Sequence, residues 1–171
     1  MNKKMIEFFM IPTIFFVVLI DSQISTLATN LSVFNVIISS HILVMFAIFF
    51  ANFVSIRFSL IAFILLGFFY DIYYFGLIGI ATTILPFVVC SMYYFFQGVE
   101  SRRFTYLLIL IVSIFQFELI SFLFARLFNL TSLSVFIFVF NSLLPSLIFN
   151  VIVFLILQPL LELFFGITNK S

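Results

Sequence analysis

The chain has 171 residues, of which 65% are hydrophobic and 8% are charged, and its mean hydropathy is +1.42. A soluble domain carries about 25% charged residues, so this composition excludes a soluble domain of any size and predicts an integral membrane protein. The net charge of +1 gives no reason to expect nucleic acid as a partner, and the single cysteine, Cys90, excludes an intrachain disulfide and a multi-cysteine metal site.

The predicted elements are apolar helices, taken in chain order. The first apolar run begins near Met5, follows Lys3 and Lys4, and has no small-residue cleavage site, so it is interpreted as a retained span rather than a signal peptide. Residues 58–97 stay apolar for too long to be one helix, and a break near 72–77 divides them into two short spans. The sequence therefore predicts an all-α polytopic bundle of about six transmembrane helices in one domain, 1–171, with spans at approximately 5–25, 36–53, 58–73, 77–97, 104–125 and 133–160.

The basic residues predict the orientation of these spans, because basic residues are retained on the cytoplasmic side. With six spans and a cytoplasmic N-terminus, only Arg126 falls outside. The others fall inside: Lys3, Lys4, Arg57, Arg102, Arg103 and Lys170. We therefore expect a multi-pass protein of a bacterial cytoplasmic membrane with both termini in the cytoplasm.

Glu118 is the most costly residue to bury, since it lies near the middle of the fifth span. It predicts a polar contact inside the bundle or with a partner helix, or a proton-carrying group; a glutamic acid bonded to nearby backbone or Asn is the simpler alternative. His41 has no second His or carboxylate at metal-ligand spacing and is expected to be shallow, so its pairing with Glu118 is expected to be poor.

Asp71 ends the third span, and Gly67, Gly76 and Gly79 surround it, which permits a close approach of backbones. Asp71 either contacts a partner or lies at the membrane boundary and caps the next helix. Asp21 is followed by Ser22 and is expected to be solvated near the outer boundary.

Pro145 and Asn150 lie in the last span. Proline frees a backbone carbonyl about one turn earlier, and a polar amide can satisfy such a group or pair with another helix.

The chain contains no phosphate-binding loop, no nucleophile elbow and no His-Glu-x-x-His pair, so no enzyme, cofactor or metal site is expected.

The run from Gly67 to Tyr74, followed by Gly76 and Gly79, resembles the signature of the MreD family, the rod shape-determining membrane proteins of bacteria. The family's intramembrane glutamate is similar to Glu118, and its late Pro-x-x-x-x-Asn element is similar to residues 145–150. The resemblance covers essentially the whole chain.

This resemblance implies a non-enzymatic component of the elongation or peripheral peptidoglycan synthesis machinery. It would bind MreC and, through it, help to position a SEDS glycosyltransferase and a class B transpeptidase, with MreB joining in rods; a homo-oligomer stays open. Members of the family also look like the S components of energy-coupling factor transporters, which are six-helix bundles that hold a small molecule near the outer face.

Three hypotheses follow. The first is a scaffold whose partners dock against small residues such as Gly67, Gly76 and Gly79. The second is a vitamin-binding S component with an outer cavity, for which the candidate lining residues are Asp21, Asp71, Tyr73 and Asn30. The third is an intramembrane enzyme or a proton-coupled transporter centred on Glu118.

Overall fold

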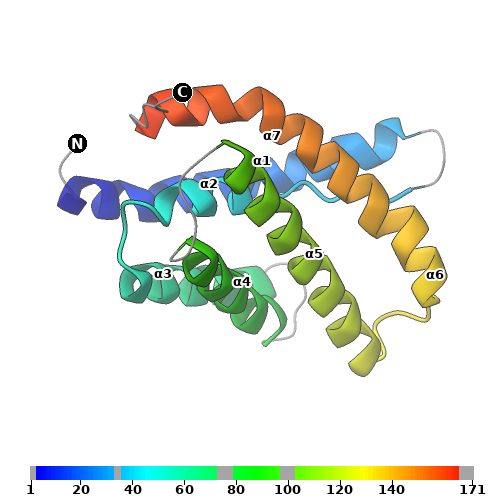
Figure 1. The fold of residues 1–171 in the computed structure, drawn as a ribbon. Helices are drawn as coiled ribbons and strands as arrows, with labels where there is room; N and C mark the ends of the chain where they lie inside the picture. Colours follow the sequence, from blue (N-terminus) through cyan, green and yellow to red (C-terminus); the bar gives the residue numbers. More distant parts are fainter. Residues whose placement is uncertain (1–2, 33–35, 73–78, 97–102, 166–171) are drawn as a thin grey trace.

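The computed structural model describes residues 3–32, 36–72, 79–96 and 103–165, and these ranges contain helices and connecting segments but no strand. The all-α prediction is confirmed. The elements are α1 (Lys3–Leu31), α2 (Ile42–Phe50), α3 (Ile56–Tyr70), α4 (Ile80–Phe96), α5 (Arg103–Leu127), α6 (Val135–Phe138), the π-helical turn η2 (Val139–Leu143) and α7 (Leu144–Phe165). The last three form one continuous apolar helix, Val135–Phe165 (Figure 1).

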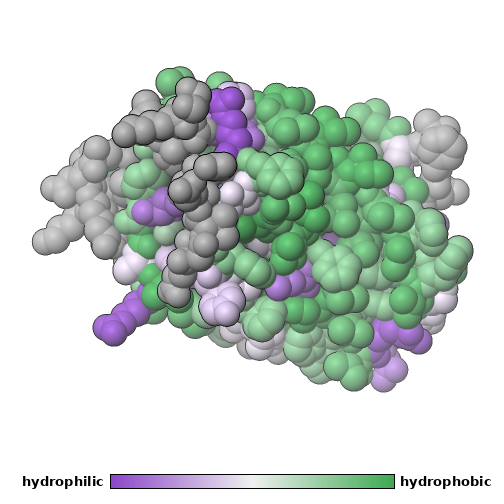
Figure 2. Space-filling view, viewed as in Figure 1, coloured by the Kyte–Doolittle hydropathy of each residue, from purple (hydrophilic) through white to green (hydrophobic). Residues whose placement is uncertain are grey.

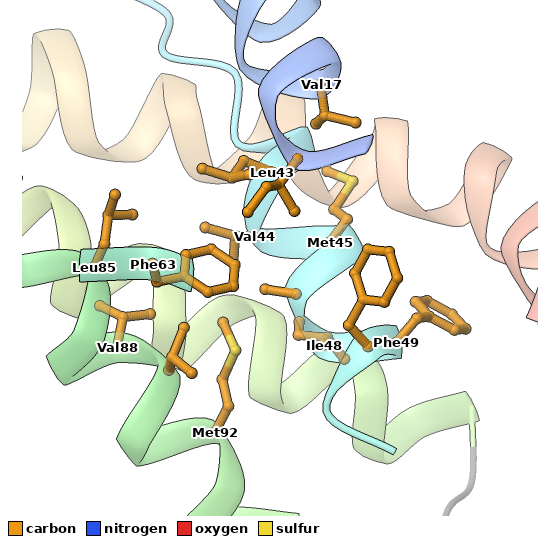
Figure 3. Close-up of a cluster of buried hydrophobic side chains, with 14 of the residues drawn as sticks. Val17, Leu43, Val44, Met45, Ile48, Phe49, Phe63, Leu85, Val88 and Met92 are labelled. Carbon is orange, nitrogen blue, oxygen red and sulfur yellow. The ribbon is translucent and has the colours of Figure 1, made fainter. Parts of the chain in front are cut away.

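Helix α2 lies at the centre of the bundle. It is only nine residues long, eight of them are buried, and it packs against α1, α5 and α7. Figure 3 shows its side chains, among them Val44 and Ile48, in one apolar cluster with Phe63 of α3 and Met92 of α4. Because α2 has neighbours on several sides, its sequence is apolar all round, as is typical of a helix buried in a membrane bundle.

The first turn of α1 and the last turn of α7 lie at the same end of the molecule (Figure 1). At this end, stacked and edge-on rings join α2 to α7, since Phe165 packs against Phe49, Phe50 and Phe53. Two charged residues also join α5 to α7 here. Their guanidinium and carboxylate groups, those of Arg103 and Glu162, pair with a shortest N–O distance of 2.9 Å.

Among the described residues, three helices are long and apolar enough to cross a membrane: Phe8–Leu31, Arg103–Leu127 and Val135–Phe165. The helices Ile56–Tyr70 and Ile80–Phe95 are apolar but shorter. The face seen in Figure 2 is mostly apolar, and its hydrophilic side chains gather mainly toward the two ends. Large exposed apolar side chains such as Phe16, Leu163 and Ile156 would be unfavourable in water and suit contact with lipid.

The helix of the second predicted span is shorter than that span. Residues 36–53 were expected to be one helix, but residues 36–41 are non-helical and only Ile42–Phe50 is helical. Helix α1, in turn, continues to Leu31, beyond the predicted end of the first span near residue 25. We call residues 36–41 the extended segment.

Candidate functional site

The extended segment lies between α1 and α7, and side chains of α1 bind one set of its backbone amides. The hydroxyl of Thr29 accepts a hydrogen bond from the N–H of Ile38 at 3.0 Å, and the hydroxyl of Ser25 accepts one from Ser40 at 2.8 Å. The two carboxylate oxygens of Asp21 accept from the first two amides of α2, at 2.9 and 3.2 Å. These three side chains recur every four residues and so lie on one face of α1.

The alternate amides of the extended segment point to the other side and bind the last long helix. The N–H of Ile37 donates to the carbonyl of Asn141 at 2.7 Å. The N–H of Ser39 donates to the Ser146 hydroxyl at 2.9 Å. The N–H of His41 donates to the side chain of Asn150, a residue that is 0% exposed.

Asn150 makes three bonds of 2.7 Å with its amide group. Its oxygen accepts from the N–H of His41, and its nitrogen donates to the carbonyls of Ser39 and Ser146. The default expectation for Asn150 was a hydrogen bond to another helix, whereas its partners outside its own helix belong to the non-helical backbone of the extended segment. We call the residues that bind the extended segment the polar ladder: Asp21, Ser25 and Thr29 on α1, and Asn141, Ser146 and Asn150 on the last helix.

The spacing of the polar ladder follows from the geometry of the two backbones. Alternate residues of an extended chain lie about 6.6 Å apart along its axis, and four helical residues rise about 6.0 Å. Each step of two residues along the segment therefore matches one step of four residues along α1. A non-helical backbone inside a membrane protein must have its polar groups bonded by protein, and the polar ladder does this for every amide from Ile37 to Leu43.

Pro145 explains why a helix carbonyl is available to the segment. Proline has no N–H to donate to the carbonyl four residues earlier, which here belongs to Asn141. The helix widens into the π-helical turn at this point, and the Asn141 carbonyl accepts from Ile37. The expected effect of Pro145, a freed carbonyl about one turn earlier, agrees with this bond.

His41, at the junction of the extended segment with α2, is buried and pairs with Glu118 of α5. The imidazole Nε2 and the carboxyl Oε1 lie 2.9 Å apart, and both side chains are less than 10% exposed. The ring of Phe117 also packs edge-on against the imidazole, with the centroids 5.1 Å apart. The expected poor pairing of His41 with Glu118 is therefore wrong, because a non-helical segment carries His41 into the bundle, beside α5.

Asp71 binds the start of α4, as its capping interpretation predicted. Its carboxylate, 0% exposed, accepts from the N–H groups of Gly79, Ala81 and Thr82 and from the Thr82 hydroxyl, at 2.6–3.0 Å. Such bonds satisfy the unpaired amides of a helix N-terminus. Gly79 has a φ of +127°, which L side chains rarely adopt.

Gly67 lies where α3 packs closely against α4. A Cβ atom at this position would lie 2.7 Å from the Ala81 carbonyl oxygen and from the Thr82 Cα, so α3 and α4 pack here with their backbones in contact. The expectation of a partner docking against Gly67 is wrong for this reason, whereas nothing lies within 4 Å of a Cβ at Gly79. Gly76 and Tyr73 lie outside the described residues.

Asp21 is half-buried, and its carboxylate accepts hydrogen bonds from the first two amides of α2, a role that the sequence did not predict. It lines a cavity of about 330 Å³ between α1, the extended segment and α5, together with His41, Glu118 and several hydroxyl side chains. Asp71 and Asn30, which were candidates for such a cavity, do not line it. The described residues hold no group of three or more His, Cys, Asp or Glu that could bind a metal ion.

Comparisons with known proteins show the family to which the chain belongs. The family model of the rod shape-determining protein MreD matches residues 2–167. The chain belongs to the MreD family. It is 32% identical over 163 residues to the cell shape-determining protein MreD of Streptococcus pneumoniae (strain ATCC BAA-255 / R6), a match that covers 95% of this chain and 97% of that protein. No solved structure gives a significant match.

In this member of the MreD family, sequence reasoning selected Asp21, Asp71, Glu118 and Asn150 but did not connect them. It missed His41 as the partner of Glu118, and it missed the other members of the polar ladder. A signal was present, because polar residues at positions 21, 25 and 29 follow a four-residue spacing and positions 146 and 150 repeat it. Polar residues on one face of an apolar helix indicate a polar partner.

Proposed function

We propose that this chain is a non-enzymatic membrane scaffold that helps to determine cell shape, as a part of the machinery that synthesises peripheral peptidoglycan. The observation that carries the proposal is the MreD family model, which matches residues 2–167 and so covers every helix described above. The relative from Streptococcus pneumoniae is itself named as a cell shape-determining protein.

The proposed direct partner is MreC. The connections between helices are short, so a partner must be recognised through helix surfaces and their rims. Large apolar side chains are exposed along α1, α5 and α7, and such surfaces can receive either lipid or a partner helix. Through MreC, the chain would act on a SEDS glycosyltransferase and a class B transpeptidase, and on MreB where the cell has it.

The construction of the bundle supports a positioning role. The polar ladder and the Asp71 cap place fully bonded polar groups at two points between helices, and these bonds favour one arrangement of the helices. The proposed location is the bacterial cytoplasmic membrane, with both termini in the cytoplasm. The charge pattern of the sequence and the common end shared by the first and last helices support this orientation (Figure 1).

Copurification tests the proposed partner. A tagged copy is extracted from its own host with a mild detergent, and the bound proteins are identified by mass spectrometry against a tagged polytopic membrane protein of unrelated family. We expect MreC to be enriched with this chain and not with the control. Recovery of an ATPase pair with its coupling subunit, without MreC, would instead indicate an S component and contradict the scaffold.

Depletion of the chain tests the proposed role separately from the partner. Cells that lose the protein should lose their normal ratio of length to width while membrane transport of vitamins stays unchanged. Restoration of shape by Glu118→Gln would further oppose a proton-transfer role, because Gln keeps a hydrogen-bonding side chain but cannot carry a proton. Loss of shape control in that variant, with normal protein level and normal MreC binding, would contradict the non-catalytic proposal.

A further inference from the structure

The cavity beside His41 is lined by a group of polar side chains in a mostly apolar bundle. Its volume is about 330 Å³, which lies at the small end of the range for ligand sites in proteins. Among its lining residues, Ser40 has a buried hydroxyl without a hydrogen-bond partner in the described part of the chain. A buried polar group of this kind indicates that water or a ligand supplies the missing bond.

The formal charges of the wall favour a cation. Asp21 and Glu118 bring two carboxyl groups to the cavity and His41 one imidazole, and no Lys or Arg is among the described residues that line it. The N-terminus of α2 would by itself attract an anion, but the carboxylate of Asp21 already accepts from its first two amides. A phosphate or carboxylate ligand would therefore meet two carboxyl groups and one imidazole, with no Lys or Arg to bind it.

The hydroxyl groups of the α1 wall present acceptors. Ser25 donates its hydroxyl proton to the carbonyl of Asp21 at 2.9 Å, and Thr26 donates to that of Ser22 at 3.0 Å. The Ser25 oxygen already accepts from Ser40 and keeps one lone pair, and the Thr26 oxygen also keeps lone pairs, for a ligand that brings donors. The described residues offer no cluster suited to a metal ion, so the donors of an organic ammonium group fit the wall better than a bare metal.

Two aromatic rings in the cavity wall also favour a cation. Tyr70 and Phe117 both line the cavity, and aromatic rings attract ammonium groups through the negative charge of their faces. Carboxylates together with aromatic rings are the combination that recognises an organic cation.

We infer that this cavity binds a small organic ammonium group, either as a free amine or as the amino headgroup of a membrane lipid. Asp21 and Glu118 supply the negative charge, the hydroxyls of α1 accept its hydrogen bonds, and Tyr70 and Phe117 contact its carbon atoms. This binding site is independent of whether MreC is the partner of the chain.

Thermal unfolding of the purified full chain in an amine-free detergent buffer tests this inference. The probe is ethanolamine, and its controls are ethylene glycol, which has the same size without charge, and glycolate, which is an anion. We expect saturating ethanolamine to raise the unfolding midpoint by about 5 °C, and neither control to do so. Equal shifts with all three probes, or no shift with ethanolamine, would overturn the inference unless the lipid arm below shows binding.

The lipid source is distinguished in nanodiscs of phosphatidylethanolamine or phosphatidylglycerol. A higher midpoint in phosphatidylethanolamine, with no further rise from free ethanolamine, assigns the site to the lipid headgroup; a rise from free ethanolamine in both lipids assigns it to a soluble amine. No effect of either source would overturn the inference.

A pair of matched variants tests whether the ammonium group binds in this cavity. Ser121→Leu fills the cavity from α5, and Ala125→Leu adds the same side chain one turn further along α5, outside the cavity. The response to the ammonium group should vanish in Ser121→Leu and persist in Ala125→Leu, and Ser22→Leu replaces the first variant if that one does not fold. A response that survives both cavity-filling changes would place the binding elsewhere and overturn the inference.

Discussion

Replacement of Asn150 by alanine should weaken the bundle more than any other single change in the polar ladder. The wild-type side chain is fully buried and makes three bonds of 2.7 Å. Its loss leaves the N–H of His41 and the carbonyl of Ser39 without their protein partner, and each such group costs about 1–3 kcal/mol when buried. Taking about 1.5 kcal/mol for each of the two groups gives an expected loss of about 3 kcal/mol, since hydrogen bonds between membrane helices are worth about 0.6–1.7 kcal/mol each.

The assay is unfolding of the purified chain by titration with SDS, followed by circular dichroism. Asn141→Ala is the matched control on the same continuous helix, because the Asn141 side chain is exposed and only its backbone carbonyl binds the extended segment. We expect this control to stay within about 0.5 kcal/mol of the wild type. A loss below 0.5 kcal/mol for Asn150→Ala, or equal losses for the two variants, would refute the reasoning.

The remaining predictions concern the His41–Glu118 pair, the α3–α4 contact and the orientation. Glu118→Leu leaves the buried imidazole of His41 unpaired and should lower the free energy of unfolding by about 1–3 kcal/mol, whereas Glu118→Gln keeps a hydrogen-bond partner and should lower it by less than about 1 kcal/mol; equal losses in the SDS titration would contradict the pairing. Gly67→Ala places a Cβ atom 2.7 Å from the Ala81 oxygen and should cost about 1–3 kcal/mol in the same titration, against almost no change for the exposed Leu65→Ala; a neutral Gly67→Ala would contradict the close contact. Green fluorescent protein fused to the C-terminus should fluoresce and alkaline phosphatase fused there should be inactive, because we expect a cytoplasmic C-terminus; the opposite pair of results would mean that the C-terminus is outside.

The helical class was predictable because apolar composition leaves few alternatives in a membrane. The break between α3 and α4 was also predictable, since Asp71 and Gly79 interrupt an apolar run that is too long for one helix. Capping by Asp71 was one of two predicted alternatives, and it could be predicted because the capped amides lie only 8, 10 and 11 positions further along the chain.

The broken second span was not predicted, for a physical reason. Residues 36–53 are apolar enough to be a helix on composition, and only distant residues determine that the first part is extended. The partners of its amides lie as far away as Asn150, 109 positions from His41. The position of His41 depends on this extended segment, so its contact with Glu118 could not follow from helical spacing.

Residue-resolved solid-state NMR of the chain in lipid bilayers tests the central structural claim most directly, by measuring backbone carbon shifts and amide exchange for residues 37–43. The polar ladder predicts non-helical carbon shifts for residues 37–40 together with slowly exchanging amides, and faster exchange at His41 in the Asn150→Ala variant. Helical shifts from residue 36 onward, or amides that exchange as fast as those of an unbonded loop, would contradict it.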